Sequence, residues 1–175
     1  MTTAFPIHLW TIILVLRDFE WVAERTNAWD AIGVAAYVMV FAFIESLFVF
    51  AIVILLGLLL PKQWDDRKRV AFLGVLVFTV AIWAILGQLF FLLGFRIPAP
   101  ILQFLAASSH PLRLLYAGLL GLVSLTLIVP VYLFIRSASV FRSVYNLMER
   151  LAVLSAIYLV FDGISLIIII IRNIT

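Results

Sequence analysis

The sequence lacks cysteine altogether and has few charged residues, and each shortage excludes a class of protein. Without cysteine there is neither a disulfide framework nor a CxxC metal or redox motif. Only 12% of the 175 residues are charged, whereas a typical soluble domain has about 25%. Apolar residues make up 66% of the chain, against about 45–50% in soluble domains. This composition excludes an ordinary soluble protein, and also a disordered one, because disordered chains are poor in apolar residues and rich in charge.

Four apolar stretches are long enough to cross a bilayer, which takes about 20 mainly apolar residues. They cover residues 31–60, 70–94, 114–135 and 151–171. We therefore predict an all-α fold, in which residues 31–175 form a polytopic membrane bundle of four transmembrane helices with short interfacial helices. The lipid bilayer is the first expected partner, and the expected location is a bacterial-type inner or plasma membrane.

Residues 1–30 form a distinct N-terminal segment. Its apolar run, 7–16, is too short to span alone and continues into a charged stretch where Arg17, Glu20 and Glu24 recur at helical spacing. This pattern predicts an amphipathic helix that lies in the plane of the lipid headgroups. The alternative is a short first span, which would invert the topology of the N-terminus.

The connections between the spans also show helical signals. Residues 97–105 look like a short helix with Pro100 in its first turn, where proline is tolerated. His110 and Pro111 then end one element and begin the next. Residues 136–150 follow an amphipathic helical spacing and predict a surface helix that runs into the fourth span.

Basic residues favour one orientation in the membrane. The first and third connections would share a side, and they carry the larger set of cations: Lys62, Arg67, Lys68, Arg69, Arg136, Arg142 and Arg150. The opposite side carries a smaller set over more residues: Arg17, Arg25, Arg96, Arg113 and Arg172. By the positive-inside rule, this bias favours an outer N-terminus and an outer C-terminus.

Two carboxyl groups, those of Glu45 and Asp162, fall near the middle of predicted spans. An ionised side chain at that depth costs about 2.5–3.5 kcal/mol or more. No Lys, Arg or His lies inside a span, so the sequence offers neither acid an obvious cationic partner there. We expect both acids to point into the bundle.

A polar cluster is predicted around these acids. Ser155, Tyr158, Asp162 and Ser165 share one face of the fourth span, and small-residue faces of the other spans carry further polar groups. The predicted cluster comprises Glu45, Gln88, Ser124, Ser155, Tyr158, Asp162 and Ser165. Hydrogen bonding between helices is the favoured role. The alternatives are a proton, ion or ligand site, and recognition of a partner's polar side chain.

Three further residues are weighed as site candidates. His8 and His110 could meet near the outer face, but an ordinary interfacial role is favoured over a metal or haem ligand. Trp83 lies inside a span, away from the interface where Trp is usual. Packing, with its indole N–H bonded to a neighbouring group, is favoured over a role as a cofactor wall.

The sequence contains no GxSxG, HExxH, P-loop or dinucleotide-binding motif, so we expect neither enzymatic activity nor catalytic residues. We likewise expect no cofactor, no metal and no nucleic-acid partner. The favoured function is an accessory or scaffold subunit of a membrane assembly, with a protein partner or a homo-oligomer in the membrane. The alternative is a proton- or cation-coupled transporter or channel component that uses Glu45 and Asp162.

Overall fold

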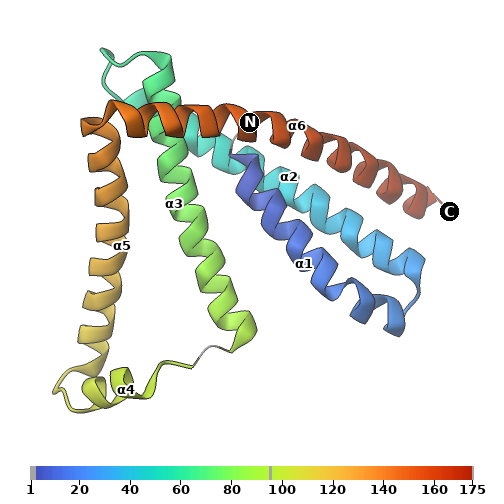
Figure 1. Ribbon diagram of the computed structural model, residues 1–175. Helices are drawn as coiled ribbons and strands as arrows, with labels where there is room; N and C mark the ends of the chain where they lie inside the picture. Colours follow the sequence, from blue (N-terminus) through green and yellow to red (C-terminus); the bar gives the residue numbers. More distant parts are fainter. Residues whose placement is uncertain (1–2, 95, 175) are drawn as a thin grey trace.

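The computed structural model describes residues 3–94 and 96–174, and most of them are helical (Figure 1). In this part of the chain no residue belongs to a strand. The helices are α1 (Ala4–Arg25), α2 (Ala28–Leu59), α3 (Asp66–Leu93), α4 (Ala99–Ala106), α5 (Pro111–Arg136) and α6 (Ala138–Ile174). The predicted all-α fold is confirmed.

Four of these helices, α2, α3, α5 and α6, are long and apolar enough to cross a membrane. They coincide with the four predicted spans, and the protein is therefore a small integral membrane protein. Of the predicted helix over 136–150, residues 138–150 form the first part of α6, a single helix of 37 residues that continues into the fourth span; its position at the membrane surface stays a prediction.

Local chemistry explains where the helices begin. The Asn27 side chain accepts a hydrogen bond of 2.9 Å from the backbone N–H of Asp30, and Asp65 caps α3 in the same way. Each cap provides a partner for an amide that has none within its own helix. Helices α4 and α5 have Pro100 and Pro111 in their first turns, as predicted.

The helices form two limbs that diverge from a common junction (Figure 1). In the three-helix limb, α2 makes its most extensive contacts with α1 and α6. In the α3–α5 limb, α3 and α5 contact each other and α6, while α4 connects their far ends. Over the described residues, the open angle leaves α5 without backbone contact to α1 or α2.

Helix α1 lies along α2 and runs antiparallel to it, because only a short turn separates the two helices (Figure 1). Ile7 in its first half shares a cavity with Glu45, and Asp18 in its charged second half lies near Ala31. The position of α1 in the headgroup plane stays a prediction.

The end of α6 is tied to the start of α2 by a glycine contact and an ion pair. A Cβ atom on Gly33 would overlap the guanidinium of Arg172. That guanidinium donates hydrogen bonds of 2.7 Å to the Asp30 carboxylate and to the Trp29 carbonyl oxygen. The close approach therefore depends on the missing side chain at Gly33.

Packing of aromatic rings and sulfur holds the two limbs together at their junction. Phe134 of α5 is 2% exposed, and its ring centroid lies 6.0 Å from that of Phe72 in α3 and 5.7 Å from that of Phe141 in α6. Between α3 and α6, Met148 covers Gly74, where an added Cβ would lie 2.5 Å from the sulfur. Helices of both limbs share this core.

A side-chain hydrogen bond joins the two long helices of the α3–α5 limb. The indole N–H of Trp83 donates to the Thr126 hydroxyl oxygen at 2.9 Å, and that hydroxyl donates to the Val123 carbonyl oxygen at 2.9 Å. The hydrogen-bonded packing role predicted for Trp83 is confirmed.

Candidate functional site

The polar stripe of α6 faces the inside of the three-helix limb. Ser155, Asp162 and Ser165 are buried, and Tyr158 is half-buried. The Ser155 hydroxyl donates to the Leu151 carbonyl oxygen at 2.8 Å, so its hydrogen bond stays within α6. Asp162 is only 7% exposed, and this inward position agrees with the high cost of a carboxyl group that faces hydrocarbon.

The partner of Asp162 is His8, at the start of α1. The Nε2 atom of His8 lies 3.0 Å from Oδ2 and 3.2 Å from Oδ1 of Asp162, and the histidine is fully buried. The two residues are separated by most of the chain, so only the packing of α1 against α6 brings them together. This contact supplies the basic partner that the spans themselves lack.

The second ring nitrogen of His8 determines how protons are shared in this pair. Nδ1 lies 2.9 Å from the carbonyl oxygen of Ala4, which can only accept, so Nδ1 carries a hydrogen and donates it. A single proton then lies between Nε2 and Asp162. Either an imidazolium donates to a carboxylate, or a protonated carboxyl donates to a neutral imidazole. In both forms the pair has no net charge, which lowers the cost of placing it among apolar helices.

Aromatic side chains enclose the pair. The His8 ring stacks on Tyr158 with a centroid distance of 5.3 Å and an interplanar angle of 7°. Phe5 lies against the same tyrosine at 5.9 Å. His8 is thus not an ordinary interfacial histidine, and that interpretation of the sequence is wrong. One signal could have identified it: His8 is the only basic residue inside an apolar run, in a chain whose spans contain unpaired acids.

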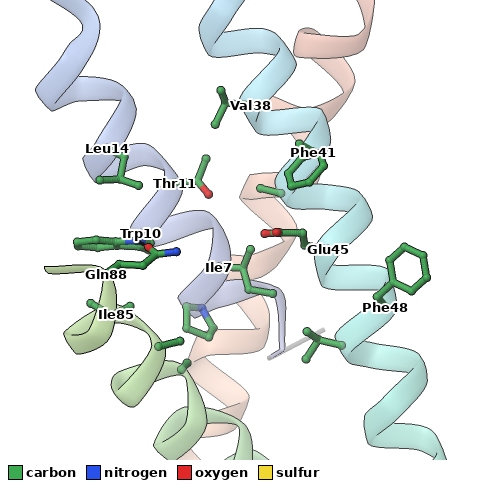
Figure 2. Close-up of a pocket in the computed structure, with 15 residues that line it drawn as sticks. Ile7, Trp10, Thr11, Leu14, Val38, Phe41, Glu45, Phe48, Ile85 and Gln88 are labelled. Carbon is green, nitrogen blue, oxygen red and sulfur yellow. Dashed lines mark hydrogen bonds between the residues drawn. The ribbon is translucent and has the colours of Figure 1, made fainter. Parts of the chain in front are cut away.

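Glu45 lies in different surroundings. It is exposed on α2 and faces a cavity of about 530 Å³ bounded by α1, α2 and α3. Figure 2 shows its carboxylate directed into the space between the helices, with Trp10 of α1 and Gln88 of α3 on the opposite side. The Trp10 indole N–H donates to the side-chain oxygen of Gln88.

The predicted cluster is therefore divided between separate places. Ser155, Tyr158, Asp162 and Ser165 share the α6 face, where His8 joins them. Glu45 and Gln88 line the cavity, together with Trp10. Ser124 is half-buried on α5, which has no backbone contact with α1 or α2 over the described residues. Ser124 is separated from the others because the two limbs diverge, and Asp162 is not among the residues that line the cavity at Glu45.

The second histidine lies elsewhere in the fold. His110 is exposed and immediately precedes α5, at the end of that helix opposite α6 (Figure 1). In residues 3–94 and 96–174, no group of three or more His, Cys, Asp or Glu side chains is close enough to hold a metal ion. The ionisable groups at the candidate site are the buried His8–Asp162 pair and Glu45, which lines the cavity.

Comparisons with known proteins add no relative. No model of a known protein family matches the chain, and no curated protein and no solved structure is similar to it. The arguments that follow rest on the residues and contacts of this chain alone.

Proposed function

We propose that the protein is an accessory or scaffold subunit of a membrane assembly and that it docks a partner's transmembrane helix against α5. The observation that carries this proposal is a pair of glycines on α5. A Cβ atom on Gly118 or Gly121 would meet nothing within 4 Å, and the two glycines lie three residues apart on one face of α5. Gly87 of α3 and Gly163 of α6 are also uncovered, but each is a single glycine, whereas Gly33 and Gly74 are covered by side chains of α6. Small residues are where membrane helices approach each other most closely.

The open shape of the molecule supports the same proposal. Its accessible surface is 12184 Å², whereas a compact protein of 19.8 kDa would expose roughly 8,600 Å². Along α5, all of whose residues the structure describes, only Phe134 is buried. Lipid covers part of this surface, but a lipid chain gains little from a glycine face. A second helix gains close packing there.

The proposal also holds that the protein is not an enzyme. It rests on the absence of a catalytic motif from the sequence. The buried His8–Asp162 pair fits a structural role because each of its polar atoms already has a partner within the chain.

Partner capture tests the docking face directly. The tagged protein, purified in mild detergent, is expected to retain a membrane partner that mass spectrometry identifies. The double variant Gly118→Leu/Gly121→Leu should reduce its recovery about tenfold, which corresponds to about 1.4 kcal/mol of lost packing. Gly163→Leu is the matched control, because an added Cβ there also meets nothing within 4 Å but lies on α6. If the partner is recovered equally well with the α5 double variant and with Gly163→Leu, α5 is excluded as the docking face.

Membrane orientation forms part of the proposal, with both termini outside. The guanidinium of Arg67, in the first turn of α3, lies 5.7 Å from the ring centroid of Tyr145 in α6. This contact supports a shared side for the two strongly basic connections, which the positive-inside rule assigns to the cytoplasm.

Cysteine labelling in intact cells tests this orientation. Because the sequence has no native cysteine, each introduced thiol reports one position. Cysteine at Asp66 or Ser139 is expected to resist an impermeant thiol reagent, and cysteine at Ser109 is expected to react. Permeabilised cells, in which all three should react, are the control, and the reverse pattern in intact cells would invert the topology.

A second candidate function is a proton- or cation-coupled transporter or channel component. The proton shared by His8 and Asp162 favours it, because titratable groups inside membranes often mark ion paths. We rank it second because the two acids do not lie along one path: Glu45 faces the cavity, whereas Asp162 is buried and engaged by His8. Proton flux into liposomes that hold the purified protein, abolished by Asp162→Asn, would reverse this ranking.

A further inference from the structure

The cavity at Glu45 has the dimensions and lining of a small-molecule site. Its volume of about 530 Å³ lies within the range of about 300–1,000 Å³ that is usual for ligand pockets. The walls come from three helices and are mainly apolar, with few polar groups among them. Such sites combine an apolar wall with a few polar groups that orient the ligand.

The charge of the cavity is one-sided. Glu45 is an acid whose side chain enters it, and Figure 2 shows the carboxylate pointing into the space between α1 and α2. The nearest base along α1, His8, is fully buried and engaged by Asp162. Arg172, in the last turn of α6, is engaged by Asp30 at the start of α2. The carboxylate of Glu45 thus faces the cavity without either of these cations.

Aromatic rings give the cavity a second feature that suits a cation. Trp10, Phe41 and Phe48 all line it; Figure 2 shows the Trp10 indole across the space from Glu45, whereas the Phe48 ring points away from that space. The faces of aromatic rings attract organic cations, and this attraction is strongest where water is excluded. Because Trp10 donates its N–H to Gln88, its ring is held in place before any ligand arrives.

We propose that this cavity binds an amphiphilic organic monocation, an ammonium group on an aromatic or aliphatic body. The ammonium group lies at the carboxylate of Glu45, where it offsets the cost of a negative charge among apolar helices. The apolar body fills the space between α1 and α3 and contacts the Trp10 ring. A basic side chain from a partner helix is the competing occupant, and the experiment below separates it from a free cation.

Calorimetry on the full-length protein in nanodiscs of zwitterionic lipid tests the proposal. The probe is phenethyltrimethylammonium, whose charge is permanent, and its comparison ligand is the neutral isostere with carbon in place of nitrogen. We expect saturable binding of one cation per chain, at least tenfold tighter than binding of the isostere. Equal affinity for the two ligands, or no saturable binding, would overturn the proposal.

Variants of the protein show whether the Glu45 carboxylate is responsible for binding the cation. Glu45→Gln should weaken binding of the cation at least tenfold and leave the isostere unaffected, because the amide keeps the shape and loses the charge. Glu24→Gln makes the same change at an exposed position of α1 that is not part of the cavity wall, and should bind like the wild type. Unchanged thermal unfolding of Glu45→Gln verifies folding. Binding of a lysine-bearing transmembrane peptide at Glu45, without binding of the free cation, would assign the cavity to a partner helix and refute the proposal.

This inference does not depend on the proposed docking role. The glycines of α5 do not line the cavity, so Gly118→Leu/Gly121→Leu should leave cation binding unchanged. Loss of partner capture with intact cation binding, or the converse, separates the two proposals.

Discussion

Replacing His8 by leucine is expected to lower the free energy of unfolding by about 3 kcal/mol, because it leaves the Asp162 carboxyl buried without its partner. Thermal or chemical unfolding in detergent, followed by circular dichroism, measures the loss. His110→Leu is the matched control, since that histidine is exposed. An equal effect of the two changes would contradict a stabilising role for the buried pair.

The double variant His8→Leu/Asp162→Leu separates the value of the pair from the penalty of an orphaned acid. With both polar groups removed, stability should return to within about 1 kcal/mol of the wild type, because well-packed apolar residues can replace a buried ion pair. The double variant should therefore lose less stability than the sum of the two single variants, and this difference is the coupling energy of the pair. A double variant that is as unstable as the sum of the singles would mean that the two residues act independently.

Asp162→Asn distinguishes a structural pair from one that carries protons. An amide N–H can donate to Nε2 of His8 in place of the carboxyl proton, so about 1 kcal/mol of stability should be lost. If the pair only joins helices, this variant keeps its cellular function. If the pair carries protons, the variant stays folded and loses its function, and Glu45→Gln beside it shows whether the second acid shares that role.

The second large effect is expected for Phe134→Ala, at the junction of the limbs. In water-soluble cores, loss of a buried phenylalanine costs about 3–5 kcal/mol. In a bilayer, helix association gains little from the hydrophobic effect, so the loss is mainly one of packing, and we expect about 2 kcal/mol. Phe104→Ala, on the exposed surface of α4, should cost much less under the same unfolding conditions. Equal losses of stability for Phe134→Ala and Phe104→Ala would show that the junction does not depend on the buried ring.

The sequence alone was sufficient to predict the helices and the spans. A span is defined by hydrophobic length, which is local, and α2, α3, α5 and α6 lie where the apolar stretches predict them. The start of α4 and that of α5 follow from prolines, whose geometry is equally local. The inward position of Asp162 and the bonded indole of Trp83 follow from the cost of leaving polar groups unsatisfied in hydrocarbon.

Only the tertiary structure decided which groups meet. Periodicity places Ser155, Tyr158 and Asp162 on one face of α6, but it does not say that His8 from the start of α1 covers that face. It equally could not show that Glu45 would face a cavity apart from Asp162, since both acids lie at the middle of their spans.

The small-residue faces show why the sequence does not determine which helix faces pack together. Gly74 is covered by Met148, whereas Gly118 and Gly121 are uncovered, although all three lie in similar apolar sequence. In a water-soluble protein, the hydrophobic effect would turn the apolar face of each helix inward, so the sequence would indicate which face is buried. In a bilayer, lipid satisfies an apolar face as well as a neighbouring helix does, so hydrophobicity does not choose between them. Close packing and a few polar pairs make that choice, and both depend on contacts between residues that lie far apart in the chain.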